Sequence, residues 1–135
     1  MAYDIEEIEG IGPAYAEKLA VAEIKNTDHL LNLCGSASGR KKVSGDTGVG
    51  ESTLLKWANM ADLMRVSGIG PQFSELLEAS GVDTIKELRT RNAENLAAKM
   101  AEVQDEKGLT KVAPTAGVIQ NWIDAAKDME PKITH

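Results

Sequence analysis

Apolar residues recur three or four positions apart along most of this chain, which is the spacing of a helix with one buried face. The segment 51–63 predicts a mostly buried helix through its apolar positions, which are Leu54, Leu55, Trp57, Ala58, Ala61 and Leu63. The segment 92–107 predicts the longest helix, because Leu96, Met100 and Val103 share one face and Gly108 follows as a stop. No stretch alternates convincingly as a strand does, so the pattern predicts an all-α fold.

Capping and turn residues place the other expected helices. In chain order these span residues 13–22, 27–33, 72–79, 84–89 and 115–129. Asn26 or Thr27 caps the helix 27–33, and Gly81 ends the helix 72–79. The stretch 35–50 is rich in glycine and serine and carries the basic triplet Arg40-Lys41-Lys42. We expect a loop there, with room for one short helix.

One short pattern occurs twice at a constant offset. Residues 8–19 read IEGIGPAYAEKL and residues 66–77 read VSGIGPQFSELL. Two glycines around one isoleucine favour a tight turn whose backbone another molecule can approach closely. A proline directly after the second glycine suits the first position of a helix. Each copy therefore predicts a turn followed by a helix N-terminus with free amides, an arrangement that accepts an anion such as phosphate.

Both copies resemble the helix-hairpin-helix superfamily, in which an apolar residue precedes Gly-apolar-Gly and a helix follows. The resemblance implies that the hairpin amides hold nucleic-acid phosphates without reading sequence, and that two hairpins pair into one compact unit. The whole chain also resembles a bacterial family of tandem helix-hairpin-helix proteins known as a domain of unknown function. That wider likeness rests on residues 8–19, 54–71, 81–84 and 92–107. It implies tandem hairpin repeats with accessory helices, residues 1–63 and 64–135 being two halves of one domain.

The composition predicts one small folded unit, whose core consists mainly of aliphatic residues and contains few aromatic ones. Trp57 and Trp122 each lie on a helix that follows a hairpin after a spacer, and we interpret both as core residues. The single Cys34 excludes an internal disulfide and fits a reducing compartment, with burial as its expected role. Since no signal peptide or membrane-spanning stretch is recognised, we expect a cytoplasmic protein that does not bind membranes.

No pattern of residues in the sequence indicates a catalytic site. Residues 45–53, GDTGVGEST, are close to a phosphate-binding loop, but Glu51 stands where that loop needs a lysine, and no apolar strand precedes it. We interpret Glu51 as the start of a helix. Neither His29 nor His135 has partners at metal-ligand spacing. We therefore expect a protein that is not an enzyme and holds no metal or cofactor.

The net charge of the chain does not favour general binding to nucleic acid. The chain carries a net charge of −6, and residues 1–35 alone hold seven acids and two bases. Proteins that bind phosphate backbones rely on lysine and arginine. Gln72 follows the second turn and can donate a hydrogen bond, whereas Ala14 follows the first turn and cannot. The candidate nucleic-acid contacts are therefore Arg65, Gly68, Ile69, Gly70, Gln72, Arg89 and Arg91, with Gly10 and Gly12 at the first turn. Arg40, Lys41 and Lys42 would extend them into one basic face if the fold brings them together.

Two interpretations follow from these features. In the first, the chain binds nucleic-acid backbone weakly and without sequence preference through the hairpins. In the second, the hairpins are purely structural and the chain is a protein-interaction, scaffold or dimerisation module. The acidic balance fits the second better, because it would steer a partner with a basic face. A homodimer is compatible with either interpretation.

Overall fold

The computed structural model describes residues 2–135, and the all-α prediction is confirmed over this range, which contains no β-strand. A short 3-10 helix, η1 (Ile5–Glu7), is followed by eight α-helices. They are α1 (Pro13–Ala20), α2 (Thr27–Cys34), α3 (Ala37–Thr47), α4 (Glu51–Leu63), α5 (Pro71–Ala79), α6 (Ile85–Leu88), α7 (Ala93–Lys107) and α8 (Ala116–Lys127). One isolated bridge joins Asp4 and Asn26.

Local capping explains where most of these helices begin and end. Five helices start at a residue whose side chain accepts a hydrogen bond from a first-turn amide: Asn26, Ser36, Thr84, Asn92 and Thr115. Gly48 and Gly108 end α3 and α7 in the left-handed conformation. The helix α4 begins at Glu51, so the near-match to a phosphate-binding loop is a helix start, as predicted.

The stretch that the sequence suggests is a loop contains the eleven-residue helix α3. Its glycines serve packing as well as turns. A Cβ at Gly39 would overlap the carbonyl oxygen of Leu33, so glycine there lets α3 approach α2 closely. Val43 lies in the core, and Arg40 is also buried. The basic triplet therefore does not lie on one exposed loop.

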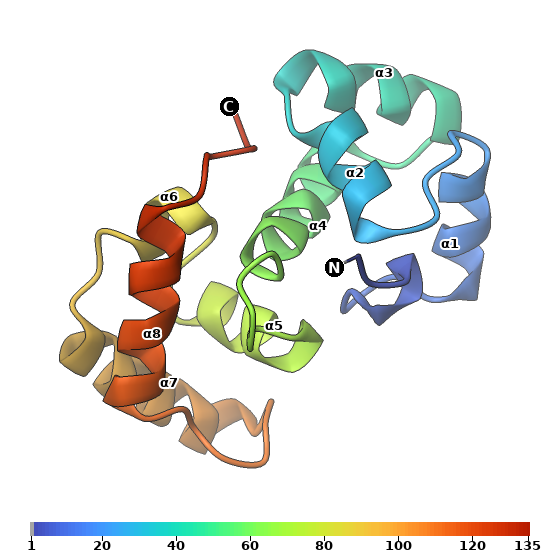
Figure 1. The fold of residues 1–135 in the computed structure, drawn as a ribbon. Helices are drawn as coiled ribbons and strands as arrows, with labels where there is room; N and C mark the ends of the chain where they lie inside the picture. The colour runs from blue at the N-terminus through green and yellow to red at the C-terminus, as the bar shows by residue number, and fades with distance from the viewer. Residues whose placement is uncertain (1) are drawn as a thin grey trace.

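The buried side chains form two clusters on either side of the junction between α4 and α5. One cluster gathers residues from η1, α1, α2, α3 and α4, and the other gathers residues from the end of α4 through α8. In Figure 1, α1 to α3 lie on one side of α4, and α6 to α8 lie on the other. The division into halves 1–63 and 64–135 remains a prediction, but the core is organised around the same region of the chain.

The C-terminal segment 130–135 crosses back from α8 to the first cluster, as the red end of the ribbon shows (Figure 1). Ile133 is buried within that cluster. The amide of Thr134 donates to the carbonyl oxygen of Gly35 at 2.8 Å. The Arg40 guanidinium donates to the carbonyl oxygens of Cys34, Gly35 and Thr134 at 2.9, 3.1 and 2.6 Å. Arg40 is therefore a buried tie between the C-terminal segment and the α2–α3 corner.

Within residues 2–135, no helix combines the length and the apolar character that crossing a membrane requires.

Candidate functional site

The two Gly-Ile-Gly turns have the same backbone conformation. Gly10 and Gly68 have φ values of 95° and 96°, in the region that favours glycine. Gly12 and Gly70 are the N-caps of α1 and α5, with φ of −91° and −92° and ψ of −175° and −171°. In each turn the isoleucine between the glycines is buried, as predicted, and its amide bonds back to the residue three positions earlier.

The first glycine of each turn is required by the fold. A Cβ at Gly10 would lie 3.3 Å from Nε1 of Trp57, and a Cβ at Gly68 would lie 3.1 Å from Nε1 of Trp122. Each indole also packs against the aromatic residue of the following helix, with ring centroids 5.0 Å apart for Tyr15 and Trp57. The equivalent distance from Phe73 to Trp122 is 5.3 Å. Both tryptophans are buried, which confirms their predicted core role.

The second glycine of each turn is not required by the fold. Any residue can adopt the φ values of Gly12 and Gly70, and apart from the adjacent residues no heavy atom lies within 4 Å of where a Cβ would stand at either position. No side chain caps α1 or α5, so their first-turn amides have no intrahelical partner. Packing within the chain gives no reason for glycine at these two positions.

This contrast gives a matched pair of variants. We expect Gly68→Ala to lower the free energy of unfolding by about 1–3 kcal/mol, through its positive φ and the contact with Trp122. We expect Gly70→Ala to be neutral or to stabilise by up to about 1 kcal/mol, because it only restricts the unfolded chain. Denaturant unfolding of both variants measures the difference, and equal destabilisation would contradict this assignment of the two glycines.

A groove of about 670 Å³ lies beside the second turn. Its lining residues come from two distant segments of the chain: Tyr3, Glu7, Glu9, Gly68, Gly70, Pro71, Gln72 and Phe73. The structure therefore places the acidic entry to the first turn next to the second turn. The first-turn glycines, Gly10 and Gly12, are not among the lining residues.

Neighbouring carboxylates act on Glu75, which lies on α5. Burial raises the pKa of Glu75 on α5 above its usual value, and the negative charges of Glu9 and Glu78 raise it further. Lys56 and Lys107 oppose that shift but do not reverse it. The second turn therefore lies in a locally acidic environment.

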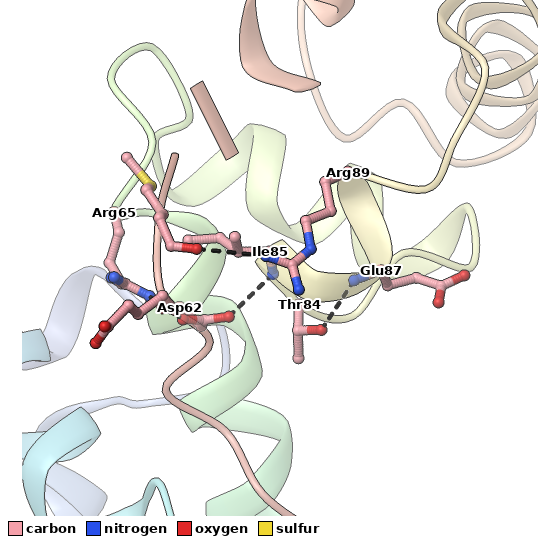
Figure 2. A network of polar contacts seen from close by, with 8 residues as sticks. Asp62, Arg65, Thr84, Ile85, Glu87 and Arg89 are labelled. Carbon is pink, nitrogen blue, oxygen red and sulfur yellow. Dashed lines mark hydrogen bonds and ion pairs between the residues drawn. The ribbon is translucent and has the colours of Figure 1, made fainter. Parts of the chain in front are cut away.

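Arg65, expected to contact nucleic acid, bonds within the chain. Its Nη1 donates to Oδ1 of Asp62 at 2.8 Å and to the carbonyl oxygen of Glu130 at 2.9 Å. Asp62 is fully buried and also accepts the amide of Ile85 at 2.9 Å through Oδ2, as Figure 2 shows. Arg65 still lines a smaller hollow of about 220 Å³ together with Gly68. It is the candidate arginine that lies nearest the second turn.

The other candidate arginines also have partners in the chain. Arg89 donates to the carbonyl oxygen of Met129 at 3.5 Å (Figure 2). Arg91 pairs with Glu87 at 2.8 Å and donates to the carbonyl oxygen of Gly81 at 2.8 Å. Neither arginine lines the groove beside the second turn. The signal that identifies Arg65 as a structural residue is visible in the sequence, since Asp62 precedes it by one helical turn.

Cys34 is buried, as expected. Burial raises the pKa of its thiol to about 11, although the charge of Arg40 acts in the opposite direction. The thiol is therefore protonated at neutral pH, which does not suit a nucleophile. Among residues 2–135 the structure also contains no group of three or more histidine, cysteine, aspartate or glutamate side chains placed to hold a metal ion.

Residues 9–129 match the model of the family described as Domain of unknown function (DUF4332), and the chain belongs to this family. No curated protein and no solved structure matches the chain.

Proposed function

We propose that this member of the DUF4332 family is a non-enzymatic interaction module built from two helix-hairpin-helix units. We further propose that its hairpin face receives a basic segment of a protein partner. The observation that carries the proposal is that Glu7 and Glu9 share one groove with the second turn. The matching dihedral angles of the two turns support the assignment of two hairpin units.

Charge at the groove favours a cation over a phosphate. A helix N-terminus stabilises an exposed anion by about 0.3–1 kcal/mol. Each exposed carboxylate interacts with a nearby charge by a similar amount, about 0.2–1 kcal/mol. Two carboxylates therefore offset the attraction of the α5 N-terminus for an anion, and both favour a lysine or an arginine.

The shape of the groove also suits a basic side chain. Tyr3 and Phe73 line it and are half-buried, so part of the surface of each residue remains accessible. A cation against such a ring gains about 0.5–1 kcal/mol. Gln72 is exposed at the same groove and can accept or donate a hydrogen bond. A lysine- or arginine-bearing segment would thus find both carboxylates and aromatic surface.

The second candidate function is sequence-independent binding of nucleic-acid backbone through the same turns. It is favoured by the space around Gly12 and Gly70 and by the first-turn amides of α1 and α5, which no side chain caps. Against it, the guanidinium groups of Arg65, Arg89 and Arg91 bond to acceptors within the chain. We therefore place it behind protein binding.

Three titrations test these candidates. The probes are a fluorescein-labelled peptide of alternating lysine and alanine, a labelled non-specific DNA duplex and a labelled single strand, all followed by fluorescence anisotropy. We expect the peptide to bind with an affinity that falls as salt rises from about 50 to 200 mM. We expect the DNA to bind more weakly than the peptide or not at all. Tighter, salt-sensitive binding of DNA would reverse the order of the two candidates.

A variant that removes the two carboxylates of the groove tests whether the peptide binds there. We expect Glu7→Gln with Glu9→Gln to weaken peptide binding about tenfold, because the groove loses two charges and keeps its shape. Glutamine at position 7 can still accept the amide of Asp4, as Glu7 does through Oε2 at 3.2 Å. The matched control is Glu102→Gln with Glu106→Gln on the exposed face of α7. If both double variants lost the same peptide affinity, only net charge would matter, and the groove would not be the binding site.

A further inference from the structure

The correspondence between the two halves continues beyond the turns at the same offset, 58 residues from Gly10 to Gly68. After α1 the amide of Ile24 bonds to the carbonyl oxygen of Leu19, and after α5 the amide of Val82 bonds to that of Leu77. The next helices then begin at equivalent capping residues, Asn26 and Thr84. Positions in α2 can therefore be compared with positions in and just after α6.

Each half has a hollow at this equivalent place. The first, of about 580 Å³, is lined by Ala22, Glu23, Lys25, His29, Asn32, Leu33 and Lys42. The second, of about 450 Å³, is lined by Asp83, Thr84, Lys86, Glu87, Thr90, Ile133, Thr134 and His135. Three pairs of lining residues occupy equivalent positions: Lys25 and Asp83, His29 and Glu87, Asn32 and Thr90.

The second hollow is lined partly by a distant segment of the same chain. Ile133, Thr134 and His135 lie along it as the C-terminal segment crosses back from α8 (Figure 1). The first hollow has no such segment, because all its lining residues come from the range 22–42. The C-terminal segment therefore forms one wall of the second hollow, whereas no distant segment lines the first.

The lining charges of the two hollows differ in balance, with two lysines and one glutamate in the first against one lysine, one aspartate and one glutamate in the second. Lys25 and His29 stand where the second half has Asp83 and Glu87, and α3 adds Lys42. Neither lysine takes part in an ion pair within residues 2–135. Glu23 is the one carboxylate of the lining. The amide of Lys25 donates to Nδ1 of His29 at 3.2 Å, so the Nε2 atom of a neutral imidazole carries the proton and can donate.

The lining of the first hollow also includes two apolar residues, Ala22 and Leu33. Leu33 stands at the position of Arg91, whose guanidinium bonds to Glu87 and Gly81 in the second half. Leucine at this position can make no such bonds. Leu33 is 41% exposed, so its side chain presents apolar surface at the hollow. The ligand suited to this surface carries negative charges and at least one apolar side chain.

We propose that the hollow between α2 and α3 binds an extended acidic segment of a partner protein, at the place where the C-terminal segment of this chain lines the counterpart hollow. Lys25, His29 and Lys42 would hold the carboxylates, and Leu33 would contact an apolar side chain. This site is separate from the groove at the turns and has the opposite charge, so it does not depend on the function proposed for that groove.

The test uses the full chain and a fluorescein-labelled peptide rich in glutamate with interspersed leucine. We expect salt-sensitive binding by fluorescence anisotropy and a loss of at least about tenfold in affinity in Lys25→Glu with Lys42→Glu. Both lysines are exposed, so the variant should keep the wild-type circular dichroism spectrum and unfolding midpoint. The matched control, Lys99→Glu with Lys111→Glu, makes the same charge change on exposed residues outside the hollow and should bind within about twofold of wild type.

Other outcomes would overturn the proposal. It fails if the wild-type chain does not bind the acidic peptide, or if both double variants lose affinity equally. It also fails if Lys25 and Lys42 instead mediate binding of the labelled DNA, or of a second copy of this chain measured by light scattering. The Glu7→Gln, Glu9→Gln variant should bind the acidic peptide as wild type does, so a failure at the groove and a failure here give different results.

Discussion

Replacing Asp62 with alanine is expected to lower the free energy of unfolding by about 3–5 kcal/mol, the cost of removing one partner from a buried ion pair. The carboxylate is fully buried and has two partners, the guanidinium of Arg65 and the amide of Ile85. Its loss leaves a buried amide at the start of α6 without an acceptor and a guanidinium without its carboxylate (Figure 2). Guanidinium chloride unfolding followed by circular dichroism measures the change.

The control for Asp62 is Asp83→Ala, a second aspartate near the start of α6 that is exposed. We expect it to change the free energy of unfolding by no more than about 0.5 kcal/mol. A loss below about 1 kcal/mol in Asp62→Ala would show that α6 and the junction between α4 and the C-terminal segment do not depend on this carboxylate.

The second large effect is expected from Arg40→Met, which should lower the free energy of unfolding by about 2–4 kcal/mol. Methionine keeps much of the side-chain volume but removes the donors to three carbonyl oxygens, which belong to Cys34, Gly35 and Thr134. We also expect faster hydrogen exchange at the amide of Thr134, because the C-terminal segment loses one of its attachments to the first cluster.

Lys41→Met is the matched control, since it makes a similar change at the exposed neighbour of Arg40. It should be neutral within about 0.5 kcal/mol. If the two variants were equally stable, Arg40 would be an ordinary surface residue, and the C-terminal segment would be held by Ile133 and its backbone alone.

Much of the fold could be predicted from local signals. The helix 51–63 was predicted with the bounds that α4 has, because its apolar spacing is regular and Gly50 precedes it. Asn26, Asn92 and Thr115 were predicted at or next to the helix starts that they cap. Such features depend on a few neighbouring residues, which is why they are visible without any knowledge of tertiary contacts.

The helix α3 was missed as a full element because its stability comes from tertiary contacts. Its glycines lower the intrinsic preference for helix. The packing of Gly39 against the α2 backbone and the burial of Arg40 and Val43 compensate for that. Neither contact can be predicted from the spacing of residues within 35–50.

The candidate site was predicted in part. The two turns and their buried isoleucines could be recognised from the repeated pattern itself. The position of Glu7 and Glu9 beside Gly70 could not, because it depends on how two distant segments pack. The bonds of Arg89 and Arg91 to backbone carbonyls were equally hidden, and they change how a basic residue near a turn should be interpreted.

The most direct test of the account is amide chemical-shift mapping on the isotope-labelled full chain, titrated with the peptide of alternating lysine and alanine. We expect shifts that saturate and are concentrated at the groove, on Glu7, Glu9, Gly68, Gly70 and Gln72. The opposite result would be a peptide that leaves these amides unchanged and a DNA duplex that shifts Gly12 and Gly70 together, since the turns would then bind phosphate.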